Sequence, residues 1–534
     1  MAPSDISPNR GFWSRLTRIW RRAEPRRFPP LFQHHVSPSP RSPPEPVQHA
    51  APDILDEIAR LLTAGQLDAA VRLRDMAESI DPAGDLLLAR YLETVAEPLA
   101  ARTRWQAAAR RQPDLAEAQD ALQRWTEGDP VPAQGAELPS IVTLPDLAAL
   151  ARTIAAPGFQ DGALLRLEVA PPAIPGPRYP LLPGTEVFST SGMPGWHDTQ
   201  APLPLPALNC YFAADAVIAG LGPITGHVWL DGRLCVGDEL MPVYLHEMCQ
   251  LARGSGPALR AVATLPMRTI EAPCVVLAGQ GMRVYGHFVI EMLPRLLLAR
   301  HALGAMEREC RYLIDRDAPS WLVRILVEDL GIPRDRLTFY RPRGERVLLR
   351  RAVLPTYAYR ADGFHPFAGA LLDALLESLP LANDAAAGRR LFVSRPAEAN
   401  PLTPKRQNRN QAALARWAAE RHGFVAVSPE IMPWPAQVAL FRQAEAVLGL
   451  FGSGMHNALF SGPGTVVATL GMGNLAQSHI GTLRGHRNAY LDVDLDQPEF
   501  DVDPSAFAAF LDAVMAGATA TGVPPPARSA VHNT

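Results

Sequence analysis

The chain has 534 residues, a length that corresponds to about three to four domain-sized units. Hydrophobic residues make up 47% of it and charged residues 20%, ordinary values for a globular protein that can bury a large core. The formal net charge of −3 gives no overall argument for nucleic-acid binding. Five widely spaced cysteines without a CxxC pair exclude a clear disulfide framework or zinc motif and favour a reducing compartment.

Residues 1–50 are rich in proline and carry eight arginines against three acidic residues. We predict that this basic tail is disordered, because it lacks the apolar residues that a core needs. Within residues 10–22, Trp13, Leu16 and Trp20 share one helical face and the arginines lie largely off it. This pattern predicts a peripheral contact with an anionic membrane, although a solvated basic tail explains it equally well. No apolar run is long enough to predict a membrane-spanning helix.

Residues 51–127 show helical periodicity. Two segments in this region, 65–70 and 113–118, resemble the helix-turn units of tetratricopeptide repeats (TPR), while a small helical bundle fits the same pattern. Either form offers a surface for protein partners. Residues 128–207 are dense in proline and glycine, and we expect a linker there.

Short strands are predicted at 208–218, 228–230 and 234–236, separated by glycine turns. From residue 311 onward, strand-like and helix-like segments alternate as far as a predicted helix at 370–379. Alternation of this kind indicates α/β layering.

Residues 285–296 read YGHFVIEMLPRL and place three ionisable side chains, His287, Glu291 and Arg295, in an apolar stretch. Burial of such groups is costly unless they are paired or used. If the segment is helical, His287 and Glu291 share a face, so the carboxylate can orient or activate the imidazole. A purely structural pair at a helix start is the alternative, and the spacing alone favours it.

Residues 389–396, RRLFVSRP, read as a strand that ends in Ser394 and Arg395. An arginine at a strand end suits bidentate binding of a diphosphate, whereas a surface charge cluster is the simpler explanation. A basic loop at 405–410 leads into a helix predicted at 411–422, which Gly423 ends.

The stretch at 447–464 reads VLGLFGSGMHNALFSGPG. It predicts a buried strand at 447–451, a glycine turn at 452–454 and a short helix at 455–460, followed by a second strand at 465–470. This layout aims the free backbone N–H groups of a helix start at an anion, usually a phosphate. We therefore predict the floor of a binding site here.

Three of these blocks resemble the family 61 glycosyltransferases. They are GHFVIEMLPRL (286–296), LFVSRP (391–396) with the downstream Arg406 and Asn410, and the segment from GFVAVSPE (423–430) to GLFGSGMHNALFSGPGTVV (449–467). The resemblance covers roughly residues 208–500. It implies an α/β protein with a GT-B-like pair of Rossmann-type domains facing a cleft, preceded by the small helical (TPR-like) region and the disordered basic tail. The N-terminal, acceptor-side domain would span 208–385 and the C-terminal, donor-binding domain 386–516, with a frayed tail at 517–534.

The resemblance also implies inverting transfer of a sugar from a nucleotide-sugar donor to a hydroxyl of a glycan or lipid-linked glycan, in surface or capsular polysaccharide synthesis. Such a transfer needs one general base and a means of neutralising the leaving diphosphate. By matching positions, His287 or Glu291 is the candidate base. The candidate donor-binding residues are Arg395, Arg406, Asn410, Gly452, Ser453, Gly454, His456 and Asn457.

The chain departs from the family pattern at two positions. Phe451 stands where the family usually has histidine, and Gln411 where it usually has glutamate. If either family residue is essential, a rival hypothesis gains weight: a non-catalytic sugar-nucleotide-binding or scaffold protein of a polysaccharide assembly system. Glu430 and Gln437 also match family positions, without an assigned chemistry beyond lining the donor domain.

We expect no tightly bound cofactor, no metal site and no nucleic-acid partner, with the nucleotide sugar acting as a substrate. The expected location is cytoplasmic, with peripheral contact at the inner face of the plasma membrane through residues 10–22.

Overall fold

The computed structural model describes most of the chain beyond residue 140. The described residues are 141–143, 150–175, 182–188, 204–221, 224–230, 233–236, 240, 265–342, 344–360, 363–381, 389–395, 407–471, 475–493 and 499–520, with isolated positions between 58 and 119. The predictions for the basic tail (1–50) and for most of the helical region (51–127) therefore lie outside the described residues. Among the described helices, none has the length and apolar character needed to cross a membrane.

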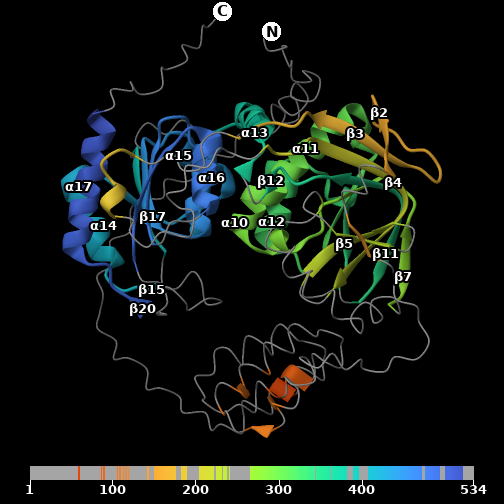
Figure 1. The fold of residues 1–534 in the computed structure, drawn as a ribbon, viewed down its shortest axis with the longest axis horizontal. Helices are drawn as coiled ribbons and strands as arrows, with labels where there is room; N and C mark the ends of the chain where they lie inside the picture. Colours follow the sequence, from red (N-terminus) through yellow and green to blue (C-terminus); the bar gives the residue numbers. More distant parts are fainter. Residues whose placement is uncertain are drawn as a thin grey trace, which may run out of the picture.

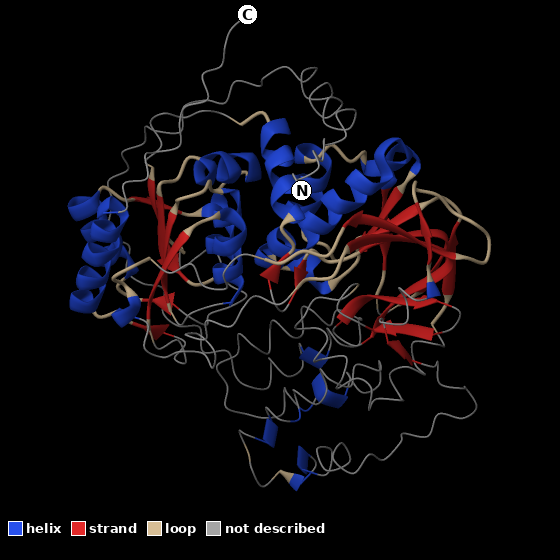
Figure 2. Cartoon of the chain, turned by 45° about the horizontal axis from the view of Figure 1, so that its top comes forward, coloured by secondary structure: helices blue, strands red, loops and turns tan. Residues whose placement is uncertain are grey.

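Two β-sheets organise the described chain, and helices fill the space between them (Figure 1, Figure 2). The larger sheet has eleven strands. They are β1 (Ile141–Thr143), β2 (Arg152–Ile154), β3 (Leu164–Ala170), β4 (Leu208–Leu221), β5 (Ile224–Leu230), β6 (Arg233–Val236), β7 (Met267–Ile270), β8 (Cys274–Val276), β9 (Arg311–Asp315), β10 (Leu337–Tyr340) and β11 (Arg346–Pro355). Strands β11, β8, β9 and β10 are neighbours in that order and run parallel, whereas β4 pairs antiparallel with β11.

Part of the segment expected to be a linker at 128–207 belongs to this sheet instead. Strand β3 pairs antiparallel with β4, with Leu165 opposite Phe212, and β2 pairs with β3. Leu165 and Ala170 are buried, so this strand contributes to the core. The prolines and glycines on both sides of the strand hid its short apolar run from the sequence pattern.

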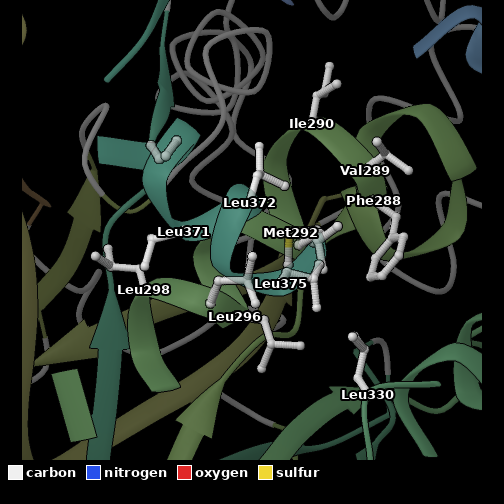
Figure 3. Close-up of a cluster of buried hydrophobic side chains, with 14 of the residues drawn as sticks. Phe288, Val289, Ile290, Met292, Leu296, Leu298, Leu330, Leu371, Leu372 and Leu375 are labelled. Carbon is white, nitrogen blue, oxygen red and sulfur yellow. The ribbon is translucent and has the colours of Figure 1, made fainter. Parts of the chain in front are cut away.

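Helices and turns follow the parallel strands β8, β9, β10 and β11 of the larger sheet. They are η2 (Gln280–Arg283), α10 (Tyr285–His287), η3 (Phe288–Met292), α11 (Leu293–Leu303), η4 (Gly304–Glu309), α12 (Ser320–Arg324), η5 (Ile325–Asp329), η6 (Arg334–Arg336) and α13 (Phe367–Ser378), with the hairpin β12 (Tyr359–Arg360) and β13 (Gly363–Phe364) before α13. Helix α11 is buried along almost its whole length, including its arginines Arg295 and Arg300. Figure 3 shows Leu296 and Leu298 of α11 close to Leu371, Leu372 and Leu375 of α13.

The smaller sheet has five strands, all parallel. They are β14 (Arg390–Val393), β16 (Val425–Val427), β17 (Ala446–Leu450), β18 (Val466–Leu470) and β19 (Arg487–Leu491). The segments around them are η1 (Glu186–Phe188), β15 (Gln407–Asn408), α14 (Gln411–His422), η7 (Pro429–Ile431), α15 (Trp434–Arg442), η8 (Ser453–Phe460), α16 (Leu475–Arg484), β20 (Glu499–Phe500) and α17 (Pro504–Ala520). The prediction of a helix at 411–422 is confirmed, and Gly423 ends it with a φ of 69°.

The order of these strands decides where a ligand can bind. It is β16-β14-β17-β18-β19, which in chain order reads 2-1-3-4-5, a doubly wound arrangement. Helices α14 and α17 cover one face, and α15, α16 and η8 cover the other (Figure 1). Ligands of such sheets bind outside the carboxyl ends of the strands where the winding reverses. Here that point lies between the ends of β14 and β17.

Candidate functional site

Arg395 and the glycine turn meet at the reversal point of the smaller sheet. Arg395 follows β14, and the turn at Gly452 follows β17. The Arg395 Nη2 donates a hydrogen bond to the Phe451 carbonyl at 3.3 Å. A Cβ added to Gly452, whose φ is +157°, would lie 1.5 Å from Arg395 Nη2, so only glycine lets the guanidinium lie across the turn.

Gln411 holds the backbone of Arg395 from both sides. Its side-chain oxygen accepts a hydrogen bond from the Arg395 N–H at 3.0 Å, and its Nε2 donates to the Arg395 carbonyl at 2.9 Å. A glutamate has no N–H and would lose the second bond. The departure from the family pattern at Gln411 therefore supplies a two-point clamp on Arg395. At Phe451, the second position that departs from the family pattern, the backbone carbonyl makes the contact with Arg395, so the contact does not depend on the side chain.

The start of η8 packs directly against α10 of the other half of the chain. A Cβ added to Gly286 would lie 2.6 Å from His456 Nδ1 and 2.9 Å from Ser453 Oγ, so a larger residue would not fit. Gly454, the second residue of η8, is buried beside Val393 at the end of β14. The predicted residues Gly452, Ser453 and Gly454 therefore all lie where the two halves of the chain meet.

His287 and Glu291 form the pair that the sequence spacing predicts. His287 Nδ1 lies 2.9 Å from Glu291 Oε1, and the side chains are 36% and 1% exposed, respectively. The segment that carries them is a helix whose turn at Phe288–Met292 widens to π geometry directly before Pro294. A proline would otherwise crowd the carbonyl four residues earlier, and such widened turns are frequent at functional sites. The result is an accessible imidazole with a buried carboxylate behind it.

Arg295, the third ionisable residue of this block, has a structural position. It is buried, donates to the Pro355 carbonyl at 2.8 Å and lies over the Tyr357 ring at 4.6 Å. It therefore ties α11 to the end of β11. Burial raises the pKa of the Tyr357 hydroxyl to about 12, although the charge of Arg295 lowers it in part, and the Glu291 carboxylate adds a smaller upward shift.

His456 connects the two groups of predicted residues. Burial and, to a smaller extent, the charges of His287 and Arg395 together lower the pKa of His456 to about 4. A Cβ added to Gly286, the neighbour of His287, would lie 2.6 Å from His456 Nδ1, and Arg395 lies across the turn at Gly452 that precedes His456, so these residues form one cluster. His456 is therefore neutral near pH 7, and the cluster combines His287 from one half of the chain with Arg395 from the other.

Asn457 is buried and already bonded on both sides of its amide. Its Oδ1 accepts a hydrogen bond from the Tyr285 hydroxyl at 2.5 Å, and its Nδ2 donates to Gln437 Oε1 at 3.0 Å. This chain of bonds joins α10 to η8 and α15. The geometry gives Asn457 a role in joining the two halves and does not favour the phosphate contact expected from the sequence.

The side chain of Asn410 is also hydrogen-bonded to other residues of the protein. Its Nδ2 donates to the Val502 carbonyl at 2.7 Å, and its Oδ1 accepts from the Val502 N–H at 3.1 Å. The pair holds the start of α14 to the chain that precedes α17, so a donor contact by Asn410 is not favoured either. Arg406, the remaining candidate, lies outside the described residues.

Two further residues act on the site without having been singled out as candidates. Tyr285 fixes the segment of His287 to η8, across 172 residues of sequence, and no local pattern reports such a contact. The sequence marks Gln411 only as a departure from the family pattern, although its place directly after Asn410, at a helix start, puts it near the basic loop. Within the described part of the chain, no group of three His, Cys, Asp or Glu residues is placed to hold a metal ion.

Residues 285–468 match the family model described as Glycosyltransferase 61. The match begins at Tyr285 and ends inside β18, so it includes His287, Glu291, Arg395 and the turn at Gly452. No curated protein matches the chain.

Proposed function

We propose that this chain, which belongs to glycosyltransferase family 61 through residues 285–468, is an inverting glycosyltransferase with a GT-B-like pair of domains. It transfers a sugar from a nucleotide-sugar donor to a hydroxyl of a glycan or lipid-linked glycan, in surface or capsular polysaccharide synthesis. Family membership supports sugar transfer in general. The observation that carries the finer proposal is the meeting of the His287–Glu291 pair with Arg395 and the Gly452 turn.

On the acceptor side, His287 is the general base. Glu291 lies 2.9 Å from His287 Nδ1, so a proton on that nitrogen is held by the carboxylate and Nε2 is left to take the acceptor proton. The buried carboxylate then stabilises the imidazolium that forms. The deprotonated acceptor oxygen attacks the anomeric carbon of the donor sugar, and the bond from that carbon to the diphosphate breaks.

On the donor side, the leaving diphosphate gains negative charge as the bond breaks. Arg395 offers a guanidinium fork at the reversal point of the sheet, and η8, whose first N–H groups belong to a helix start, begins directly after the Gly452 turn that Arg395 lies across. We propose that these groups supply the neutralising charge, without a tightly bound cofactor. Because burial keeps His456 neutral near pH 7, it adds no second positive charge there.

The experiment is calorimetry of the full-length chain with nucleoside diphosphates and nucleotide sugars, combined with assays of donor hydrolysis and transfer. Arg395→Ala should weaken nucleotide binding about 10- to 100-fold, because a charge-assisted contact is lost. Glu291→Gln should keep that affinity and lower turnover by about 100-fold or more. Arg389→Ala, an exposed arginine before the amino end of the same strand, is the matched control and should behave like the wild type.

Two outcomes would contradict the proposal. Unchanged nucleotide affinity in Arg395→Ala would remove the diphosphate contact. Binding without hydrolysis or transfer would favour the non-catalytic sugar-nucleotide-binding protein. The membrane contact through residues 10–22, protein partners at residues 51–127 and a cytoplasmic location stay predictions about regions that the structure does not describe or test.

A further inference from the structure

Gln437 lies on α15, at a position that matches the family pattern but to which the sequence assigns no chemistry. It is 7% exposed, and both ends of its side-chain amide are hydrogen-bonded. Its Oε1 accepts a hydrogen bond from Asn457 Nδ2 at 3.0 Å, and its Nε2 donates to the Met432 carbonyl at 3.0 Å. Gln437 therefore connects the chain before α15 with η8, which begins directly after the glycine turn.

The direction of these hydrogen bonds is fixed from one end. The Met432 carbonyl only accepts hydrogen bonds, so the NH2 group of Gln437 must face it and the amide oxygen must face Asn457. Asn457 then has to present its own NH2 group to Gln437, which leaves its oxygen for the Tyr285 hydroxyl. Burial raises the pKa of Tyr285, although the side chains of Trp434 and Asn457 lower it in part, so the hydroxyl keeps its proton near pH 7 and donates. The orientation of one amide, at Gln437, thus decides whether Tyr285 finds an acceptor.

This chain of hydrogen bonds ends on the helix that carries the proposed base. Tyr285 and His287 belong to the same three-residue helix, α10. The hydrogen bond from the Tyr285 hydroxyl to Asn457 Oδ1, at 2.5 Å, crosses from one half of the chain to the other. Asn457 is fully buried, so a partner that its amide loses is not replaced by bulk water. The position of α10 against η8 therefore depends on how the Asn457 amide is held.

We propose that Gln437 is a positioning residue for the general base His287. It acts through Asn457 and Tyr285, and the inference rests on the proposed function. Without the Gln437 oxygen, the Asn457 amide is free to turn and to present its NH2 group to Tyr285, so α10 shifts against η8. A displaced base removes the acceptor proton more slowly, whereas Arg395, which takes no part in this chain of bonds, still binds the diphosphate.

The test measures the release of nucleoside diphosphate by the full-length chain from UDP-, GDP-, CDP- and ADP-linked sugars, with water as the acceptor, together with calorimetry of the free diphosphates. Gln437→Met keeps the length of the side chain and removes both hydrogen bonds. We expect about tenfold lower kcat, with nucleotide affinity within about twofold of the wild type. Gln437→Glu keeps an acceptor for Asn457, so its kcat should stay within about threefold of the wild type.

A matched control and a double variant separate this role from a general loss of packing. Gln443→Met changes the same residue type directly after α15, where Nε2 donates to the Ala439 carbonyl of that helix, and it should leave kcat unchanged. The double variant Tyr285→Phe with Gln437→Met should lose about tenfold in kcat, as each single variant does, because both changes break one chain of bonds. Independent sites would instead give a loss of roughly 100-fold.

The remaining outcomes overturn the inference. If Gln437→Met weakens nucleotide binding as much as it lowers kcat, or lowers only the melting temperature, the residue has a structural role alone. Multiplied losses in the double variant would show that Gln437 does not act through Tyr285. If Gln437→Met does not fold, Gln437→Ala takes its place. It leaves room for a water molecule that satisfies both partners without fixing their direction, and it should show the same loss of kcat.

Failure of the proposed function is distinguishable from failure of this inference. If the wild type releases diphosphate from none of the nucleotide sugars, sugar transfer and the positioning role both fail. If the wild type is active and Gln437→Met turns over at the same rate, only the positioning role of Gln437 fails.

Discussion

The carboxyl ends of the two sheets position their polar groups in different ways. At the smaller sheet, Arg395 is fixed by backbone contacts: the Gly452 turn leaves room for its guanidinium, and Gln411 clamps its main chain. At the larger sheet, His287 is fixed by side chains, through Glu291 and through the bond from Tyr285 to a distant helix. In the proposed function, the first arrangement binds an anion tightly and the second sets the position of a base relative to that anion. Changes in the two regions should therefore affect different steps.

The sharpest way to break the smaller-sheet arrangement is Gly452→Ala. The new Cβ would lie 1.5 Å from Arg395 Nη2, and the backbone φ of +157° disfavours any residue with a side chain. The guanidinium must leave the turn, so we expect about 100-fold weaker nucleoside diphosphate binding, measured by calorimetry. Gly462→Ala is a matched control in the same segment, because no atom lies within 4 Å of its added Cβ. Equal binding by the two variants would show that Arg395 does not need the turn.

The corresponding change at the larger sheet is Tyr285→Phe, which removes one hydroxyl and keeps the ring that packs edge-on against Trp321. The bond to Asn457 Oδ1 is lost, and with it the direct link between the segment of His287 and η8. Small displacements of a catalytic group lower turnover, so we expect about tenfold lower kcat with nucleotide affinity within about twofold of the wild type. A loss of affinity with unchanged kcat would assign Tyr285 to the donor side and remove the contrast between the regions.

The same contrast explains which parts of the site could be predicted from the sequence. The glycine turn and the strand end at Arg395 are local patterns, and so is the spacing of His287 and Glu291, because a turn or a helix alone brings those atoms together. The bonds of Asn457 and Asn410 depend on chain segments 172 and 92 residues away. No short pattern reveals that their amides are already used, so both were expected to contact the donor. Strand β3 was missed for a related reason, since only its pairing with β4 identifies it.

The fold could likewise be predicted where local sequence patterns decide it, and not where distant residues must meet. In the smaller sheet, β14, β17 and β18 each carry a continuous apolar run bounded by glycine, proline or polar residues, which predicted these three strands closely. The strand order and the junction of the two halves come from contacts between distant residues. The place where Arg395 meets the segment of His287 could therefore be proposed only from a family resemblance until the structure joined them.

Buried carboxyl groups and buried histidines respond to pH in opposite ways, which gives the smallest effect to measure. In the larger-sheet half, burial and, to a smaller extent, the nearby Glu328 together raise the pKa of Asp329 to about 7. In the smaller-sheet half, burial lowers the pKa of His456 to about 4 and that of His486 to about 3. Asp329 keeps its proton in the native state up to about pH 7 but loses it near 3.8 when unfolded, so its contribution to stability falls as pH rises through that window. The lowered pKa of the histidines has the opposite effect on the free energy of unfolding, which falls as pH decreases from about 6.5 towards 4.

Asp329→Asn separates these opposing effects because an amide has no proton to lose. The melting temperature of the variant should rise relative to the wild type as pH increases from about 4 to 7, by a few degrees, and the difference should stay constant above pH 7. Asp335→Asn, at an exposed position of the same half, should show no such widening. If the Asp329→Asn difference is the same at every pH, this carboxyl ionises alike in both states. The pH response of stability would then come from other groups, among them the histidines whose pKa burial lowers.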